Sequence, residues 1–316
     1  MTESITVLGS INTDLVIKTP TLPTQGTTVL GGEFYRASGG KGANQAVAAA
    51  RLARQSVRFV SAVGDDQFGV EAREGLEREN LDLEHIKVVE GVASGVALIM
   101  VDGQGENQIA VASGANLELT RKDVSRADSA FVEGGVFLAC LESPWEAVLA
   151  GLRKAKAAGM TTILNPAPAN RCIMREDYLE LVDILTPNQS EAIELADAGQ
   201  SRLKGLLRSA DLFQELGCQR IVITRGADGL LIVDGDEATS VESHVVEAVD
   251  TTAAGDAFNG ALAVALAEGK PLFESCRWAS AAAALSVTRL GAQPSLANRE
   301  ELEGFLNDQA PMTKHQ

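Results

Sequence analysis

The sequence has little basic charge for its size. Its 316 residues include 27 lysines and arginines against 43 aspartates and glutamates, which gives a formal net charge of −16. Proteins that bind nucleic acid need clustered lysines and arginines beside the phosphates. We therefore expect no nucleic-acid partner. A small anionic ligand stays compatible with this balance, because one pocket can be locally positive on an acidic protein.

Cysteine is also scarce. The four cysteines are far apart in the sequence and form no CxxC pair, which argues against a zinc cluster. We expect buried thiols in a reducing compartment. No apolar run approaches the roughly 18 residues that span a bilayer, and the start of the chain shows no signal peptide. The expectation is a cytoplasmic protein without a membrane partner.

Three common catalytic motifs are missing. There is no Walker A loop, since Gly42 follows Lys41, and no GxSxG of a hydrolase. Gly103 and Gly105 lack the third glycine of a dinucleotide fingerprint, because Gln108 takes its place. A dehydrogenase is therefore poorly supported.

What the sequence does contain is an alternation of strand-like and helix-like segments. Residues 5–8 and 58–63 are short apolar runs typical of buried strands, whereas 43–53 and 145–158 have helical periodicity. Such alternation predicts an α/β fold with a mostly parallel central sheet and helices on both faces. We expect one domain over residues 1–316, with ligands at the carboxyl ends of the strands.

Two segments break this alternation. Residues 15–36 and 95–112 are rich in Val, Ile, Thr and Gly, and the run Asp-Gly-Gln-Gly at 102–105 is a hairpin signal. They predict a small separate β-sheet, the alternative being an extension of the main sheet. A detached sheet would serve as a lid that excludes water, and its exposed face is a candidate surface for a homodimer.

The segment 249–260 is the most informative. Small residues lead into an apolar helix over 257–267, whose first turn contains Asp256. Backbone N–H groups and the helix dipole favour an anion at such a start. We expect Gly255 to allow a tight turn and a close approach of ligand to backbone. Asp256 is placed to take a proton from a hydroxyl, although alone it could simply cap the helix.

Two glycine-containing stretches carry polar side chains toward the same end of the sheet. In Gly39-Gly40-Lys41-Gly42-Ala43-Asn44, the lysine and the asparagine offer donors to a ligand. The alternative is a glycine-rich turn with a solvated lysine. Asn12 and Asp14 lie two residues apart, so an extended backbone puts both on one face, where they suit vicinal hydroxyls. A polar capping turn is the alternative.

Three weaker signals follow other strands. Asn188 and Glu191 have the spacing of a helix capping box, and they also suit an outer-shell magnesium site. The turn 223–229 either forms a wall of a nucleotide pocket or merely reverses the chain. Glu142 follows a predicted strand at its carboxyl end, and the rigid segment 165–169 is a candidate pocket rim.

With these motifs, the chain resembles the ribokinase-like, or phosphofructokinase B, family of ATP-dependent sugar and nucleoside kinases, from residue 7 to about 306. The stretches 39–44 and 250–260 match the family signatures. Four further stretches resemble the members that phosphorylate ribose: Gly-Ser-Ile-Asn-Thr-Asp at 9–14, Leu-Glu-Ser-Pro at 141–144, Asn-Pro-Ala-Pro-Ala at 165–169 and Gly-Ala-Gln-Pro-Ser at 291–295.

The resemblance implies a role for each matching position. Asp256 is the implied base, and Ala253, Ala254 and Gly255 supply the anion-hole amides. The positions implied to bind the sugar are Asn12, Asp14, Gly40, Lys41, Gly42, Asn44 and Glu142. Those implied to border ATP, with Gly255, are Asn188, Thr224, Arg225, Gly226, Ala227, Asp228, Gly229 and Ser280. Ser280 and Arg225 depart from the usual family residues.

The resemblance also implies two cations and a homodimer joined through the lid. The residues implied to hold magnesium, bound with ATP, are Asn188 and Glu191. Six positions are implied to bind potassium, and several of them would do so through backbone carbonyls: Asp250, Thr252, Ser286, Arg289, Gly291 and Ser295.

The leading hypothesis is therefore ATP-dependent phosphorylation of D-ribose, giving D-ribose 5-phosphate and ADP. The nearest alternative is a related kinase acting on 2-deoxyribose, another sugar or a nucleoside. A different class of protein, a non-catalytic sugar-binding regulator, would be expected to lack Asp256 or Gly255, and both are present.

Overall fold

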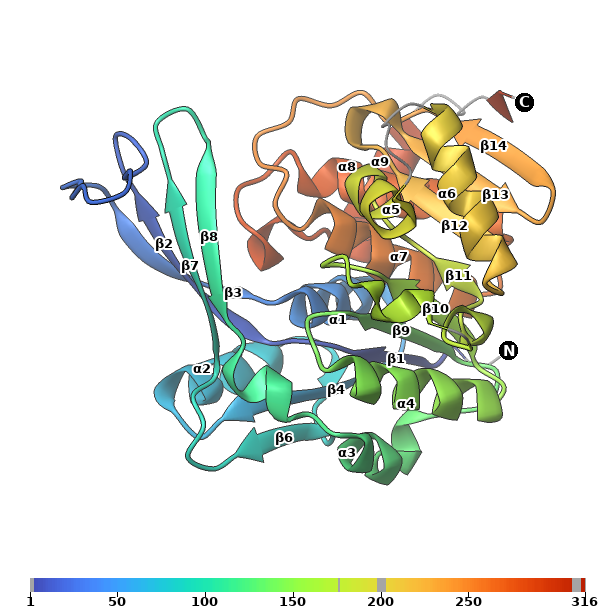
Figure 1. The fold of residues 1–316 in the computed structure, drawn as a ribbon, viewed down its shortest axis with the longest axis horizontal. Helices are drawn as coiled ribbons and strands as arrows, with labels where there is room; N and C mark the ends of the chain where they lie inside the picture. Colours follow the sequence, from blue (N-terminus) through green and yellow to red (C-terminus); the bar gives the residue numbers. More distant parts are fainter. Residues whose placement is uncertain (1–2, 176, 198–202, 309–313, 316) are drawn as a thin grey trace.

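The computed structural model describes residues 3–175, 177–197, 203–308 and 314–315. These residues form a central eleven-stranded sheet with helices on both faces (Figure 1). The strand order is β15-β14-β13-β12-β11-β10-β9-β1-β4-β5, with β6 also paired to β4. The strands are β1 (Ile5–Leu8), β4 (Val57–Gly64), β5 (Leu81–Asp82), β6 (Ile86–Val89), β9 (Val136–Cys140), β10 (Thr161–Asn165), β11 (Ile184–Leu185), β12 (Arg220–Thr224), β13 (Leu230–Asp234), β14 (Glu237–Val241) and β15 (Lys314–His315).

Most of this sheet is parallel, as predicted. Pairing is parallel from β12 through β11, β10, β9 and β1 to β4, whereas β13, β14 and β15 pair antiparallel at one edge. The antiparallel edge follows from the short turn 225–229, which reverses the chain between β12 and β13. The predicted α/β class is confirmed.

Each face of the sheet has its own hydrophobic core, because side chains alternate along the strands. In β9, Val136 and Leu138 pack into one core, while Phe137 and Ala139 pack into the other. The first core takes in α1 (Lys41–Leu52), α2 (Gln67–Leu76), α7 (Ala254–Ala267), α8 (Leu272–Ser286) and α9 (Arg299–Asp308). The second takes in α3 (Arg121–Arg126), α4 (Trp145–Ala157), α5 (Gln189–Ala196) and α6 (Leu203–Glu215).

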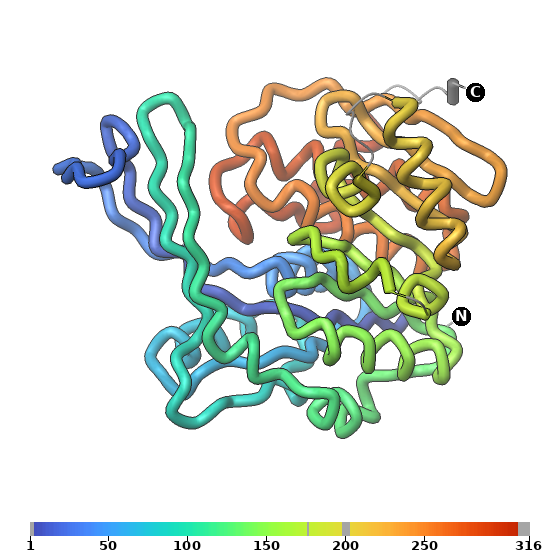
Figure 2. The backbone as a smooth tube through the Cα atoms, viewed as in Figure 1, coloured from blue at the N-terminus to red at the C-terminus, as the bar shows by residue number. Residues whose placement is uncertain are grey.

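A second, four-stranded sheet projects from this body (Figures 1 and 2). It has the order β3 (Phe34–Gly39), β2 (Asn12–Lys18), β7 (Gly95–Val101) and β8 (Asn107–Ala112), and we name it the lid sheet. The separate sheet is confirmed, and so is the 102–105 hairpin turn between β7 and β8. The predicted limits 15 and 36 were too narrow. The strands begin at Asn12 and end at Gly39, so the 12–14 motif lies within the lid sheet, whereas Lys41 and Asn44 of the 39–44 motif lie in α1.

Two expectations from composition concern the cysteines and membranes. Cys140, Cys172, Cys218 and Cys276 are all buried free thiols. Among the described residues, no helix combines the length and the apolar character that a membrane crossing requires.

Candidate active site

The first turn of α7 contains Asp256. The helix begins at Ala254, and the residue before it, Ala253, has the left-handed backbone φ of 59°. A non-glycine residue in this region costs about 1–3 kcal/mol and is often found at functional sites. The prediction that Gly255 makes the tight turn is therefore wrong, because Ala253 makes it and Gly255 is helical. First-turn N–H groups have no partner within their own helix, so they point outward and can bind an anion.

The Asp256 carboxylate is held by two amides from α1. Asn44 Nδ2 donates to Oδ2 and Gln45 Nε2 donates to Oδ1, both at 3.0 Å. The two helices approach closely because Gly260 faces α1, where a Cβ would lie 2.6 Å from that of Ala48. Burial raises the pKa of Asp256, whereas the Lys41 ammonium and the two amide donors lower it. The site thus contains a buried carboxylate that is held in a fixed orientation.

Charged side chains gather on one side of Asp256. Glu142 Oε2 accepts hydrogen bonds from Ser10 Oγ at 2.6 Å and from the Lys41 amide at 3.0 Å. Burial lowers the pKa of Lys41, but the carboxylates of Asp256 and Glu142 more than offset this and raise it. Burial, with Glu142, raises the pKa of Asp14 to about 6. Three carboxylates therefore share this partly buried space with one ammonium group.

The lid sheet contributes Asn12 and Asp14 to the same side. Asn116 Nδ2 donates to Asn12 Oδ1 at 2.8 Å. Both side chains lie against glycines: a Cβ on Gly39 would come within 2.3 Å of the Asp14 carboxylate, and one on Gly95 within 2.2 Å of Asn12 Oδ1. The predicted extended geometry of the 12–14 motif is confirmed, since both residues lie in β2.

The glycine-rich stretch also has a structural role. Gly40 precedes α1 with φ 89°, and Gly42 packs against the backbone of Gly9 and Ser10, where a Cβ would lie 2.4 Å away. Gly42 therefore brings α1 against the end of β1. The turn interpretation holds, and Lys41 is partly buried beside the carboxylates rather than fully solvated.

On the other side of α7 lies a cavity of about 470 Å³. Ala254 and Gly255 line it, so the anion-binding turn opens into it. Of the expected ATP-binding residues, six line it and three do not; the six are Thr224, Gly226, Ala227, Gly229, Gly255 and Ser280, and the three are Asn188, Arg225 and Asp228. Arg225 instead donates from Nη2 to the carbonyl of Leu230 at 3.3 Å.

Sequence reasoning missed several residues of both regions. In the cavity these are Leu230, Ser243, His244, Val245, Val246, Ala248, Thr251, Phe258, Ala283, Ala284 and Val287. They are mostly small or apolar, and apart from Thr251 and Phe258, which lie in the 250–260 stretch, they have no motif signal. Around the charged cluster, Ser10, Gln45 and Asn116 were given no role, although Ser10 and Gln45 lie inside or directly after recognised motifs, and Asn165 was expected only at the pocket rim.

The capping interpretation of Asn188 and Glu191 is confirmed. Asn188 Oδ1 accepts from the Glu191 amide at 2.9 Å, and Glu191 Oε2 accepts from the Asn188 amide at 2.8 Å. Asn188 also forms a parallel bridge with Thr224, beside the cavity. Asn188 thus lies next to a cavity residue, and the oxygen atoms of Asn188 and Glu191 are donors that suit magnesium through its waters.

The residues expected to bind potassium come from two neighbouring segments. Asp250 Oδ1 accepts from the amide and hydroxyl of Thr252, and Oδ2 accepts from the Gly291 amide at 2.8 Å. The amides of Val249 and Asp250 both donate to Val287 O. Arg289 is paired with Glu301, so only its backbone is available to a cation. Carboxylate, hydroxyl and carbonyl oxygens are the hard donors that such a cation prefers.

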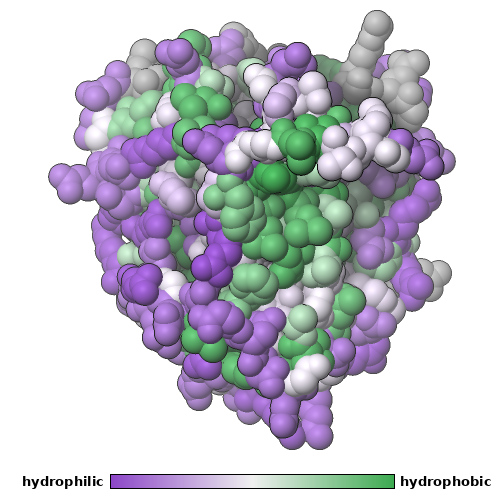
Figure 3. Space-filling model, turned by 90° about the vertical axis from the view of Figure 1, so that its left-hand side faces the viewer, coloured by the Kyte–Doolittle hydropathy of each residue, from purple (hydrophilic) through white to green (hydrophobic). Residues whose placement is uncertain are grey.

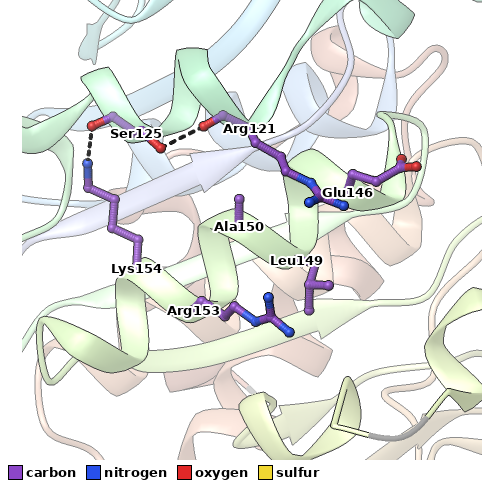
Figure 4. A pocket seen from close by; sticks show the side chains of 7 residues that line it. All are labelled: Arg121, Ser125, Glu146, Leu149, Ala150, Arg153 and Lys154. Carbon is purple, nitrogen blue, oxygen red and sulfur yellow. Dashed lines mark hydrogen bonds between the residues drawn. The ribbon is translucent and has the colours of Figure 1, made fainter.

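A second hollow lies between α3 and α4, away from Asp256 (Figure 4). Its lining is Arg121, Ser125, Glu146, Leu149, Ala150, Arg153 and Lys154. Two of its cations are already paired, Lys154 with Asp128 at 2.6 Å and Arg153 with Asp177 at 2.8 Å. None of the expected site residues lines this hollow.

The fold and the site together define a carbohydrate kinase. Residues 2–299 match the model of the pfkB family of carbohydrate kinases, and the chain belongs to that family. It is 40% identical over 306 residues to the ribokinase of Haemophilus influenzae, covering 97% of this chain and 99% of that one. The crystal structure of a ribokinase from Thermotoga maritima is similar, with a TM-score of 0.86, 36% identity and coverage of 96% and 99%. The Arabidopsis thaliana ribokinase complexed with ribose and ATP has a TM-score of 0.86 at 28% identity, covering 98% and 100%.

Proposed function

We propose that this chain transfers the γ-phosphoryl group of ATP to the 5-hydroxyl of D-ribose. The observation that carries the proposal is the position of Asp256. It lies between a cluster of charged and amide side chains that suits a polyhydroxy ligand and a helix start that opens into a 470 Å³ cavity. Relatives named ribokinase, one of them complexed with ribose and ATP, support ribose and ATP as the ligands.

In this proposal, Asn12, Asp14, Lys41, Asn44 and Glu142, with the backbone at Gly40 and Gly42, bind the sugar hydroxyls. The 5-hydroxyl faces Asp256, which accepts its proton as the oxygen forms a bond to the γ-phosphorus. The bond from that phosphorus to the β,γ-bridging oxygen breaks, and ADP leaves with the electron pair. The chemistry needs positioning and charge stabilisation more than covalent help, which the amides of Ala253, Ala254 and Gly255 supply.

We place ATP in the cavity beside Thr224, Gly226, Ala227, Gly229 and Ser280. Magnesium would be held through waters by Asn188 and Glu191, and when bound it neutralises charge on the phosphates. Potassium would be held near Asp250, Thr252, Ser286, Arg289, Gly291 and Ser295. A cation there would strengthen the field of the neighbouring anion-binding turn.

We further propose that the lid sheet closes the sugar site and joins two subunits. Asp14 and Val16 lie two residues apart in β2 and share one face of the lid sheet. Paired residues of neighbouring strands share a face, so this face also includes Ala97 and Ile99 in β7 and Ile109 and Val111 in β8. Ile109 and Val111 are more than half exposed. Figure 3 faces this side of the molecule and shows a broad apolar area. Apolar area of this kind favours a protein partner, here a second copy of the chain.

We place the enzyme in the cytoplasm. ATP is the phosphoryl donor in this proposal, and buried unpaired thiols suit a reducing compartment.

The test is ADP release with ATP and Mg²⁺, comparing ribose with 2-deoxyribose, fructose and adenosine, each with and without K⁺. We expect ribose to give the highest kcat/KM and K⁺ to increase turnover. Faster turnover on another acceptor would replace the substrate and keep the kinase. Absence of turnover on all four would contradict the proposal and favour a sugar-binding regulator, which ligand-binding measurements would then test.

A further inference from the structure

Gln45 is a buried amide that contacts the proposed catalytic base. Its side chain lies in α1 and is fully shielded from solvent. Nε2 donates two hydrogen bonds, one to Asp256 Oδ1 and one to Asn165 Oδ1, both at 3.0 Å. Gln45 therefore connects the start of α7 to the end of β10, where Asn165 lies.

From Asn165 the hydrogen bonds continue through the sheet and return to α7. Asn165 Nδ2 donates to Thr186 O at 2.9 Å, and Thr186 Oγ1 donates to Asn259 Oδ1 at 2.6 Å. Asn259 Nδ2 then donates to Gly255 O at 2.8 Å. The chain of bonds thus starts at Asp256 and ends at the residue next to it.

The direction of every bond in this chain is fixed by its ends. Thr186 O and Gly255 O are backbone carbonyls, which can only accept. Asn165 and Asn259 must therefore present their NH₂ groups to these carbonyls and their oxygens to Gln45 and Thr186. Gln45 in turn must present its NH₂ group to Asn165, and the same NH₂ group reaches Asp256. A rotated Gln45 amide would place oxygen against two acceptors.

Folding alone does not explain an amide at this position. Among the described residues, Gln45 Oε1 has no hydrogen-bond partner, although the atom is buried. An unsatisfied buried polar atom destabilises a folded protein, and an apolar side chain of similar size would avoid it. The amide is instead explained by its two acceptors, Asp256 Oδ1 and Asn165 Oδ1, which both need a hydrogen-bond donor.

We propose that Gln45, oriented by Asn165, is a positioning residue that fixes the Asp256 carboxylate for proton transfer. The inference rests on the proposed role of Asp256 as base. Gln45 occupies one lone pair of Oδ1 as Asn44 does for Oδ2, which stops the carboxylate from rotating and leaves a lone pair on each oxygen for the sugar hydroxyl.

The same contact favours the ionised form of the base. The ionisable groups facing Asp256 are Lys41 from α1, Glu142 after β9, Glu191 from α5 and Cys140 at the end of β9. Burial is the largest influence and raises the pKa of Asp256, Glu142 adds to this, and Lys41 and the amides of Asn44 and Gln45 oppose it. Removing the Gln45 donor therefore raises that pKa further and narrows the pH range in which Asp256 accepts a proton.

The test compares Gln45→Leu, Asn165→Leu and the double variant with the wild type. We expect Gln45→Leu to lower kcat about tenfold or more and to move the acid limb of the kcat–pH profile to higher pH. The ribose Kd from calorimetry should change by less than about threefold. Asn165→Leu should act in the same direction with a smaller effect. Because Asn165 acts through Gln45, the double variant should match Gln45→Leu within about twofold.

Thr162→Val is the matched control. Thr162 lies in the same strand as Asn165, is fully buried, and donates to Leu181 O at 2.6 Å. Loss of this hydrogen bond should lower the Tm and leave the kcat–pH profile unchanged. If Gln45→Leu does not fold, Gln45→Met, which is unbranched and of similar length, gives the same readouts.

The outcomes separate this inference from the proposed function. Near-normal turnover by Asp256→Asn would contradict the role of Asp256 itself. An inactive Asp256→Asn variant together with a Gln45→Leu profile that keeps the wild-type acid limb would overturn the inference alone. So would additive effects of the Gln45 and Asn165 changes, because Asn165 would then act independently.

Discussion

The two sides of Asp256 are built differently. Toward the lid sheet, the site uses charged side chains, namely Asp14, Lys41 and Glu142, which are partly buried and interact with one another. Toward the cavity, most lining residues are small or apolar, and the polar side chains among them are Thr224, Ser243, His244, Thr251 and Ser280. The proposed sugar side therefore recognises its ligand through charge and side-chain hydrogen bonds. The proposed nucleotide side recognises its ligand through shape, uncharged polar side chains and the amides at the start of α7.

The two sides also differ in how much they destabilise the free protein. Burying charged side chains together destabilises the free protein, as the raised pKa of Asp14 shows. The cavity has one ionisable residue among its lining, His244. Removing a charge on the proposed sugar side should therefore lower activity and raise stability. Substitutions on the proposed nucleotide side should change how well the nucleotide fits the cavity.

The largest effect is expected for Asp256→Asn. Removing the proposed base should lower kcat by about 10²–10⁴-fold, the range that general base catalysis contributes. Asparagine keeps the size of the side chain but puts an NH₂ group where Asn44 or Gln45 donates, so a lower Tm is also expected. Steady-state ADP release measures the first effect and differential scanning calorimetry the second.

A ribose titration by calorimetry is the control for this variant. Binding within about tenfold of wild type would assign the loss to proton transfer. If kcat instead stays near the wild-type value, Asp256 only joins α7 to α1 through Asn44 and Gln45, and its proposed role as base is wrong.

The next effect is expected for Asp14→Asn. A hydrogen bond to a charged group is worth about 1.5–3 kcal/mol, so ribose affinity should fall about 10–100-fold, with the ATP KM unchanged. The variant should also be more stable than the wild type. The carboxylate ionises near pH 6 in the folded protein against 3.8 in the unfolded chain, a penalty of up to about 3 kcal/mol.

The sign of this penalty fixes its pH dependence. Below pH 3.8 both states are protonated at Asp14 and the penalty is absent. As pH rises to about 6, the unfolded chain loses its proton first, so wild-type stability falls. Urea unfolding should show the advantage of Asp14→Asn at pH 8 and little of it at pH 4. Asp128→Asn, which removes an exposed carboxylate whose pKa Lys154 lowers, should not be stabilised at pH 8.

The same contrast explains what the sequence could and could not predict. The clustering of residues on the proposed sugar side was predictable because they have functional side chains in short motifs, such as Asn12 and Asp14 in β2. The cavity lining was mostly missed because alanines and valines have the same pattern in any core. The turn at Ala253 was assigned to Gly255, since sequence alone favours glycine wherever φ is positive. The α/β order followed from periodicity, whereas the lid limits failed because polar site residues interrupt the strand pattern.

On the nucleotide side, Gly255→Ala should produce opposite changes in stability and activity. Gly255 is helical, and a Cβ there meets no atom within 4 Å. Alanine should therefore stabilise α7 by up to about 1 kcal/mol. The added methyl group lies at the cavity and crowds the phosphates, so the ATP KM should rise about tenfold, with ribose affinity unchanged. Thermal unfolding and two-substrate kinetics measure both, and an unchanged ATP KM would remove Gly255 from the phosphate site.

The smallest effect is expected for Arg225→Ala. The sequence placed Arg225 at the nucleotide, but its side chain donates to Leu230 O and does not line the cavity. Loss of this bond should lower stability by about 0.5–1.5 kcal/mol and change the ATP KM by less than about twofold. Ala227→Leu is the matched variant, because Ala227 lies in the same turn and lines the cavity. It should raise the ATP KM without affecting ribose. If Arg225→Ala raises the ATP KM as much as Ala227→Leu does, then the nucleotide side also uses a charged side chain, and the two sides of Asp256 differ less in their recognition chemistry than their linings indicate.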